Sequence, residues 1–387
     1  MPEPETPYLS YMAYPVRLFL LATALATATA QASVDRLTAL GDLNQALLDD
    51  SNSFIYPASL SEWPRFAVEL YDDWAGVAYP LSSRHSLGLF FNRPTAEIAD
   101  LAAYVQDSGS DLFRALNPSP WFDLAYNFAP RDNLVLGLAT ALAYDRSTLE
   151  SRIASTTLLD IRLGARLGAH RILDIGLGVR NYRLRDQTLA GVEYGQTDGA
   201  GFNLDLRYRW PIGERLLLLP YLSLGRDAYA LAPQEHTQTY MHLGAGLQLT
   251  PTRGMLVIAA LDTGLERSKL AQSDAPLADD HRFHLPTWIL GGEARVGSMV
   301  LRLGMRHQSQ WNDRERLHTG QWIESSAFAT SLTTHLGLGF EFAALQLDGL
   351  LERDFLRDGP HFLGGSRHGG GILSHLSLTY RFDPPGR

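Results

Sequence analysis

Charged side chains recur at every second position of several apolar stretches. The stretch 202–210 reads FNLDLRYRW, and the stretch 159–167 reads LDIRLGARL. This alternation has the period of two that a β-strand produces, so each strand has one apolar face and one charged face. In a membrane-spanning barrel the apolar face turns toward lipid and the charged face lines the lumen. The chemistry to expect is therefore that of ion pairs inside a barrel.

The same alternation assigns a set of charged residues to the lumen. They are Asp160, Arg162, Arg166, Asp174, Arg180, Asp205, Arg207, Arg209, Glu293, Arg295, Arg302, Arg306, Glu341 and Asp348. Carboxylates and guanidinium groups on neighbouring strands can pair with one another. A selectivity filter concentrates one sign of charge instead. The mixture favours a structural network of ion pairs, with a role in selectivity as the alternative.

Histidines provide the main candidates for catalysis. His242, His335 and His375 fall on inward positions of their expected strands, with Ser374 and Ser377 close to the last of them. Their spacing matches no arrangement of nucleophile, base and orienting group. We therefore expect no catalytic residue, and the histidines are interpreted as polar fillers of the lumen.

The composition excludes several classes of function. Charged residues make up 19% of the 387 residues, and there is no cysteine. Soluble domains carry about 25% charged residues, so a barrel that alternates polar and apolar positions fits better. Without cysteine there are no disulfides or thiolate metal sites. The net charge of −9 argues against nucleic acid as a partner. We expect no metal and no cofactor.

The first 32 residues have the pattern of a secretory signal peptide. Arg17 precedes the uncharged run 18–30 (LFLLATALATATA), and Ala30-Gln31-Ala32 forms an A-x-A site. The run is shorter than the about 20 residues that a membrane-spanning helix needs. We expect residues 1–32 to be a signal peptide cleaved after Ala32, with an uncleaved anchor as the alternative and Met12 as a second candidate start.

Alternating stretches continue along the rest of the chain and predict an all-β, antiparallel barrel over residues 65–382. We expect about 16 strands, an even number as bacterial single-chain barrels have, with 14 as the rival count. The expected strands are 66–72, 74–80, 85–92, 120–129, 133–145, 155–167, 171–183, 200–212, 215–229, 237–250, 254–267, 286–296, 299–311, 328–342, 345–355 and 371–382.

The connections between these strands alternate in length. Short turns are expected near 81–84, 130–133, 168–171, 212–215, 251–254, 297–298 and 343–344, and long polar connections near 94–118, 185–199, 230–237, 268–284, 312–326 and 356–370. Outer-membrane barrels have short periplasmic turns and long extracellular loops. The last strand ends on Phe382, as does the signal that barrel-assembly machinery recognises, although a C-terminal extension, 383–387, follows it.

The segment before the first strand carries a recognisable pattern. It contains LLDD at 47–50 and YPASL at 56–60. It resembles the L-x-D-D … N-P-A-x-L signature near the N-terminus of the FadL/PorV-like outer-membrane family, with Tyr56 where that family usually has Asn. The stretch 75–81 (AGVAYPL), leading to 86–89 (SLGL), also looks like the second and third strands of that family.

This resemblance covers residues 37–92 and implies that the N-terminal segment folds into the barrel as a hatch. Some members of that family pass hydrophobic compounds, so the resemblance also implies a lumen plugged near its periplasmic mouth and lateral transport of apolar ligands. The residues themselves agree in part, because acidic and amide side chains form turns and an apolar patch follows them. Residues 33–64 are therefore expected to be a hatch, with a periplasmic strap as the alternative. The expected hatch or gate residues are Asp49, Asp50, Asn52, Phe54, Tyr56 and Pro57.

One amphipathic helix is expected in a loop. Residues 95–106 (TAEIADLAAYVQ) place Ile98, Leu101, Ala102 and Val105 on one helical face, and Thr95 is a suitable N-cap. The helix is interpreted either as a lid at the barrel mouth or as a rim helix that stabilises the loop.

These patterns predict a protein of the Gram-negative outer membrane, exported through the periplasm. The leading functional hypothesis is a channel or transporter for small molecules, apolar or amphipathic ones among them. The alternative is a structural barrel that binds a partner envelope complex, and the third hypothesis is an enzyme that acts on outer-membrane lipid. The expected partners are outer-membrane lipid and the barrel-assembly machinery.

Overall fold

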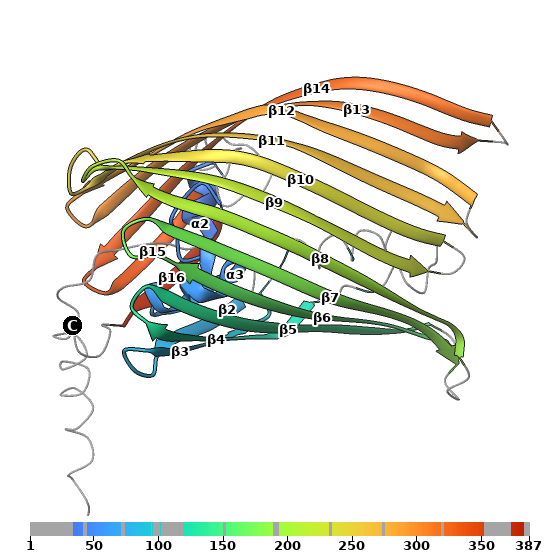
Figure 1. Cartoon of the computed structure of the whole chain (residues 1–387), viewed down its shortest axis with the longest axis horizontal. Coiled ribbons are helices and arrows are strands. Elements are labelled where there is room, and N and C mark those ends of the chain that lie inside the picture. Colours follow the sequence, from blue (N-terminus) through green and yellow to red (C-terminus); the bar gives the residue numbers. More distant parts are fainter. Residues whose placement is uncertain are drawn as a thin grey trace, which may run out of the picture.

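The computed structural model describes residues 34–41, 45–70, 74–93, 95, 101, 116, 119–149, 152–188, 193–231, 234–272, 275–318, 321–351 and 373–382. The strands form one closed antiparallel barrel in which each strand pairs with its neighbours in the chain and β1 pairs with β16 (Figure 1). The expected all-β barrel of 16 strands is confirmed. No helix in the described part of the chain is long and apolar enough to cross a membrane.

The strands differ greatly in length. Their bounds are β1 Arg65–Glu69, β2 Trp74–Pro80, β3 His85–Phe91, β4 Ser119–Arg131, β5 Leu134–Leu149, β6 Arg152–Leu167, β7 Ile172–Thr188, β8 Glu193–Pro211, β9 Leu216–Leu231, β10 Gln234–Leu249, β11 Met255–Gln272, β12 Ala275–Val296, β13 Met299–His318, β14 Gln321–Phe342, β15 Leu345–Leu351 and β16 Leu373–Arg381. The wall is therefore low from β15 round to β3 and high from β5 to β14. Over its described partners, β14 pairs with β15 only between Gly337 and Phe342.

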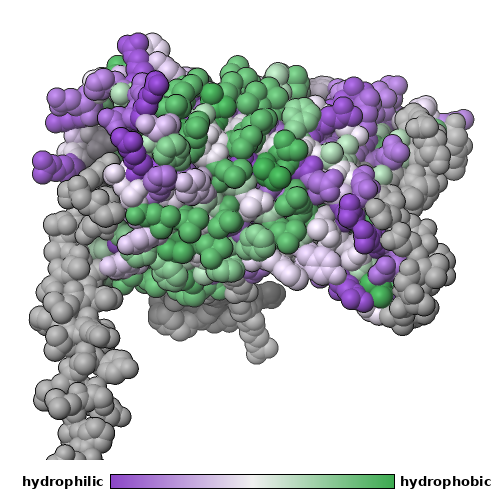
Figure 2. Space-filling view, turned by 60° about the horizontal axis from the view of Figure 1, so that its bottom comes forward, coloured by the Kyte–Doolittle hydropathy of each residue, from purple (hydrophilic) through white to green (hydrophobic). Residues whose placement is uncertain are grey.

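Apolar and polar side chains alternate along the strands as expected. The apolar side chains face outward and the polar ones face the lumen, which is the reverse of a soluble protein. Leu136, Leu138 and Leu163 are 46, 47 and 49% exposed, whereas Asp174 and Arg207 are 1 and 0% exposed. Figure 2 shows the exposed apolar side chains as a belt across the visible face of the wall, with hydrophilic residues on both sides of it. Such a belt is the surface that a membrane-spanning barrel presents to lipid.

Short turns join consecutive strands at one end of the barrel, here called the turn rim. Gly168, Gly213 and Gly297 each have a positive φ in these turns, and Ala343 has φ 55° in the last one. A positive φ suits tight hairpin turns and costs least at glycine. The short turns lie where the sequence places them.

The prediction of long connections at 185–199, 230–237, 268–284 and 312–326 is wrong. Apart from their tips, these residues belong to strands that continue beyond the apolar belt. The expected strands stopped where apolar alternation stopped, but backbone pairing needs no apolar side chains. Cross-strand ion pairs accompany the extensions, as between Arg267 and Asp279 (Nε–Oδ1 2.9 Å).

Several other expectations lie outside the described residues. These are the signal peptide (1–32), the C-terminal extension (383–387), the connection at 356–370 and most of 94–118, which contains the expected amphipathic helix. Of that helix, Leu101 is described. It is fully buried in a cluster with Leu116 and inward side chains of β5, β6 and β7.

The N-terminal segment lies inside the barrel. It forms the short helices α2 (Val34–Ala39) and α3 (Asn52–Ile55) and the 3₁₀ helix η1 (Pro57–Glu62). Figure 1 shows α2 and α3 in blue, enclosed by the strands near the turn rim. Helix α2 contacts β13 to β16, and η1 contacts β2 to β6. We call the described residues 34–41 and 45–62 the plug.

Candidate functional site: a plug in the charged lumen

Inward glycines let the plug backbone approach the wall. A Cβ at Gly137 would lie 2.3 Å from the amide nitrogen of Ala58, and one at Gly176 would lie 2.4 Å from the carbonyl oxygen of Ile55. Both distances are too short for any residue other than glycine. The same holds on β10, β12, β13 and β14, where the close pairs are Gly246 with Ala46, Gly291 with Leu40, Gly304 with Gly41 and Gly337 with Ala39. The inner wall is therefore shaped to the plug over much of its circumference.

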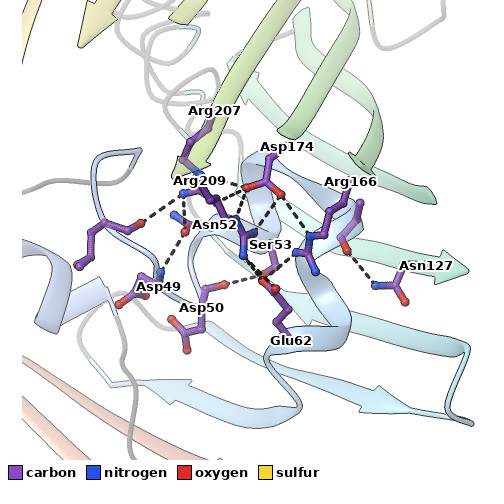
Figure 3. Close-up of polar contacts among 12 residues, drawn as sticks. Asp49, Asp50, Asn52, Ser53, Glu62, Asn127, Arg166, Asp174, Arg207 and Arg209 are labelled. Atoms are coloured by element: carbon purple, nitrogen blue, oxygen red, sulfur yellow. Dashed lines mark hydrogen bonds and ion pairs between the residues drawn. The ribbon is translucent and has the colours of Figure 1, made fainter. Parts of the chain in front are cut away.

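Glu62, at the end of η1, ties the plug to β6 and β8 (Figure 3). Its carboxylate lies 2.8 Å from Nη2 of Arg166 and 2.9 Å from Nη1 of Arg209. Both arginines also contact Asp174 on β7, at 3.3 Å from Nε of Arg166 and 2.6 Å from Nε of Arg209. Asp174 is 1% exposed and also receives Nη2 of Arg207 at 2.9 Å. One buried carboxylate thus gathers three arginines of the wall.

Arg207 holds the middle of the plug. Its Nη1 donates to the side-chain oxygen of Asn52 at 2.7 Å and to the carbonyl oxygen of Leu47 at 3.3 Å. The guanidinium lies 4.6 Å from the centre of the Tyr56 ring, a cation–π contact. Tyr56 itself is fully buried.

The other end of the plug is held by Arg36 on α2. Its Nη1 contacts Asp49 at 2.8 Å, and its Nε contacts Glu293 on β12 at 2.7 Å. Glu293 is shared with Arg302, whose Nη1 also contacts Asp348 at 2.6 Å. Arg36 therefore has one anionic partner within the plug and one on the wall.

Asp49 and Asp50 are adjacent buried carboxyl groups. Nε of Arg65, at the start of β1, lies 3.0 Å from Asp50. Burial raises the pKa of Asp50 well above its ordinary value, against the charge of Arg65, and Asp49 raises it further. Burial also opposes ionisation of Asp49, but the hydrogen bond with Asp50 and the charge of Arg36 bring its pKa below the ordinary value. Each carboxyl group of the pair has an arginine beside it, Arg36 for Asp49 and Arg65 for Asp50.

Phe54 and Pro57 complete the expected gate residues. The Phe54 ring meets Phe90 edge-on at 4.8 Å between centroids, and the Arg93 guanidinium lies 3.9 Å from its centre. The Phe54 carbonyl oxygen accepts from Nη1 of Arg162 at 2.6 Å. Pro57 is buried against Gly164 of β6. All six expected gate residues thus lie in the plug.

The charged residues expected in the lumen all lie on inward-facing positions, and most are paired. Arg162 contacts Asp123 and Asp160 at 2.5 and 3.0 Å. Arg295 pairs with Glu341 near the turn rim. The remaining pairs include Arg180 with Asp227 at 2.8 Å, and Asp205 with Gln45, Asn203 and Ser223. Arg306 also lies on the inward face of its strand, β13.

The network also contains residues that were not among the site residues expected from the sequence, among them Arg36, Glu62, Arg65 and Asp227. Asp227 follows the alternation of its strand and could have been found from it. Arg36, Glu62 and Arg65 lie in or beside an irregular segment, where no period indicates the direction of a side chain.

The three histidines considered for catalysis lie on β10, β14 and β16. His242 has its own neighbours, since Nδ1 lies 3.4 Å from Asp262 and Nε2 lies 3.5 Å from Glu266. His335 and His375 are on strands four and six places further along the sheet. The fold therefore does not gather the three around one site.

Comparisons with known proteins add little to this geometry. No family model matches the sequence, and no curated protein does either. Among solved structures, the ferric yersiniabactin uptake receptor FyuA from Yersinia pestis is 7% identical, over 82% of this chain and 79% of that one, with a TM-score of 0.33. The siderophore receptor PiuA from Acinetobacter baumannii is 7% identical, over 74% and 48%, with a TM-score of 0.41. The copper transporter OprC is 8% identical, over 82% and 64%, with a TM-score of 0.37.

The chain spans about half the length of the PiuA receptor. TM-scores this low carry no weight for the function of this chain. The resemblance to the FadL/PorV-like family is not confirmed by these comparisons and stays a prediction. What the fold and the site define is a class: a closed barrel of 16 strands with an apolar belt and an N-terminal plug in a charged lumen.

Proposed function

We propose that this chain is an outer-membrane transporter whose lumen is closed by the plug and opens when the plug moves. The apolar belt and the closed barrel support a place in the outer membrane. Short turns are periplasmic in such barrels, so the plug would close the periplasmic half of the lumen.

The observation that carries the proposal is the way charge is divided between plug and wall. If the plug moves away, Arg166 and Arg209, which contact Glu62, still have Asp174 as a partner. Arg302, which contacts Glu293, still has Asp348. Within the plug, Arg36 keeps Asp49. Removing one partner of a buried pair is strongly destabilising because it leaves an unpaired charge. These groups therefore keep a partner on their own surface when the plug leaves the wall, and Glu62, whose two arginine partners both lie on the wall, is already 29% exposed to solvent.

The lining of the lumen bears on the cargo. Beyond the plug, the inward faces of β9 to β13 carry polar groups, among them Tyr221, Asp262, Glu266 and His284. A fully apolar molecule would have to desolvate these groups without giving them hydrogen bonds. The apolar cargo suggested by the family resemblance is therefore less suitable than a small polar or amphipathic one.

Conductance in planar bilayers tests the role of the plug. The variant Arg36→Gln/Glu62→Gln removes the two plug charges that contact Glu293, Arg166 and Arg209 on the wall. We expect wild-type protein to conduct rarely, and the variant to open more often and to admit small solutes faster into proteoliposomes. Arg267→Gln, at an exposed pair far from the plug, is the matched control and should behave as wild type.

Equal, steady conductance by wild type and variant would show an open pore and contradict the proposal. Silence from both, together with co-purification of an envelope partner, would favour the alternative of an interaction barrel.

A further inference from the structure

A second polar cluster lies in the lumen beyond the plug. It is made by inward side chains of β9 to β12, here called the upper-lumen cluster: Tyr221, Tyr240, His242, Asp262, Glu266 and His284. The Tyr221 hydroxyl donates to Asp262 at 2.7 Å, and Nε2 of His284 lies 3.0 Å from Glu266. Asp262 and Glu266 remain about one-fifth exposed. These carboxylates therefore keep surface that a molecule in the lumen could reach.

The cluster sits directly over the plug. Tyr221 packs against the apolar core that Leu37, Leu40 and Leu47 of the plug form with the wall. On β10, Gly246 touches the plug at Ala46, and His242 faces the same side four residues further on. Four strand residues correspond to about 13 Å. A solute held at the cluster would thus lie one short step from the plug.

The wall is irregular at this cluster. The pairing of β11 with β12 shifts between Asp262 and Gly264, and the pairing of β12 with β13 shifts between His284 and Trp288. The hydroxyl of Thr263 donates to the carbonyl oxygen of His284 at 2.7 Å and stabilises this irregularity. Bulges in the middle of a strand re-aim side chains and occur beside functional sites. Here the shift accompanies the 7% exposed His284 turned toward Glu266.

Three glycines make room for the rings of the cluster. A Cβ at Gly244 would lie 2.4 Å from the tip of the Tyr221 ring, and one at Gly225 would lie 2.5 Å from that of Tyr240. At Gly264 it would lie 2.5 Å from the His242 ring. Each ring therefore packs against a glycine of a neighbouring strand instead of projecting across the lumen. In this packing Tyr221, Tyr240 and His242 all remain partly exposed.

The charges of the cluster indicate which ligand fits. Arg282 contacts Glu266 at 2.9 Å, and His242 lies between the two carboxylates, 3.4 Å from Asp262 and 3.5 Å from Glu266. The described part of the chain also holds no group of His, Asp and Glu suited to a metal ion. The cluster thus combines carboxylate acceptors with guanidinium, imidazole and phenol groups, and this mixture suits an uncharged molecule that carries hydroxyl groups. Hydroxyl groups can donate to the carboxylates and accept from imidazole or phenol at the same time.

We propose that the upper-lumen cluster binds a neutral, polyhydroxylated molecule of sugar size as the cargo that waits above the plug. This inference rests on the proposed transport function, which it makes more specific. The carboxylates and histidines bond to hydroxyl groups, and the tyrosine rings pack against the apolar face of the sugar.

Calorimetric titration of the purified full chain in detergent tests the site. The probes are maltose, sucrose and raffinose, with choline and inorganic phosphate as charged comparators. We expect at least one saccharide to bind and neither charged probe to do so. Glu266→Gln should weaken saccharide binding about tenfold, as the loss of a hydrogen bond to a charged group does. Tyr221→Phe, which loses only a hydroxyl, gives a second measurement if Glu266→Gln does not fold. Asp279→Asn is the control and should bind as wild type.

Absence of binding by every saccharide, preferential binding of choline or phosphate, or unchanged affinity in both variants would overturn the assignment. Failure of this inference can be told apart from failure of the transporter proposal. If the plug variant still raises conductance while no saccharide binds, the gated transporter stands and only the cargo is wrong.

Discussion

Tyr56 is a buried residue whose ring and hydroxyl have opposite effects on stability. Its ring is fully buried under Arg207, yet its hydroxyl has no hydrogen-bond partner among the described residues. An unsatisfied buried hydroxyl costs about 1–3 kcal/mol. The ring contributes packing and a cation–π contact, whereas the hydroxyl contributes nothing to the stability of the plug.

We therefore expect Tyr56→Phe to unfold at the same or a higher urea concentration than wild type, with a free energy of unfolding higher by up to about 1 kcal/mol. Tyr56→Ala should lose about 3–5 kcal/mol through the cavity that it leaves. Urea unfolding in lipid vesicles, followed by tryptophan fluorescence, measures both. A large loss in Tyr56→Phe would mean that the hydroxyl has a partner and would contradict this account.

Asp174 is the residue on which the wall network depends most. It contacts Arg166, Arg207 and Arg209 and is almost fully buried. Asp174→Asn leaves buried guanidinium groups without their shared anion, and such a change costs about 3–5 kcal/mol. The pair Arg183–Asp198, in which both side chains are about half exposed, provides the comparison. We expect Asp198→Asn to have little effect on the same urea transition.

Among the elements, β12 offers the sharpest comparison of the two faces of the wall. A Cβ at Gly291 would lie 2.7 Å from the carbonyl oxygen of Leu40 in the plug, whereas one at Gly292 would meet nothing closer than 3.9 Å. Adjacent residues of a strand point to opposite faces, so only the first touches the plug.

Gly291→Ala should push the plug from the wall and raise the conductance of the barrel in planar bilayers. Gly292→Ala, one residue away, should conduct as wild type does. Equal conductance of the two variants would show that the close approach of plug and wall does not control passage.

The long strand pairs from β7 to β14 illustrate a limit of sequence patterns at the level of elements. Apolar alternation marks the part of a strand that faces lipid, and it ends where the belt ends. Beyond the belt both faces are wet, and charged residues such as Arg267 and Asp279 stand on paired strands as readily as in loops. The length of a strand beyond the membrane depends on its partners on the neighbouring strands, and a single sequence does not reveal those partners.

For the whole molecule, the transporter proposal requires the plug to move as solute passes. The chain contains no cysteine, so introduced thiols are the only ones present. Glu62→Cys with Arg166→Cys places one thiol on the plug and one on the wall, at positions that contact each other in the wild type.

A cleavable bifunctional thiol reagent should bridge this pair and stop solute entry into proteoliposomes, and cleavage of the bridge should restore it. Glu62→Cys alone, treated in the same way, is the control. Unchanged entry in the bridged protein would show that solutes do not need plug movement.

The sequence by itself determined the class of fold. Alternation along stretches such as 202–210 sets which residues face lipid and which face the lumen, because the geometry of a strand leaves no other choice. The strand count and the position of each short turn follow from the same pattern and from glycines such as Gly213.

Only the tertiary structure decided where the irregular N-terminal segment lies and which charges meet. Residues such as Glu62 and Arg209 are 147 positions apart in the chain, and their contact depends on closing the barrel around the plug. The upper-lumen cluster likewise takes side chains from four strands, and it lies at register shifts that the alternation of side chains does not predict. Local periodicity specifies a strand, whereas a site inside the barrel depends on register and closure, which are properties of the whole chain.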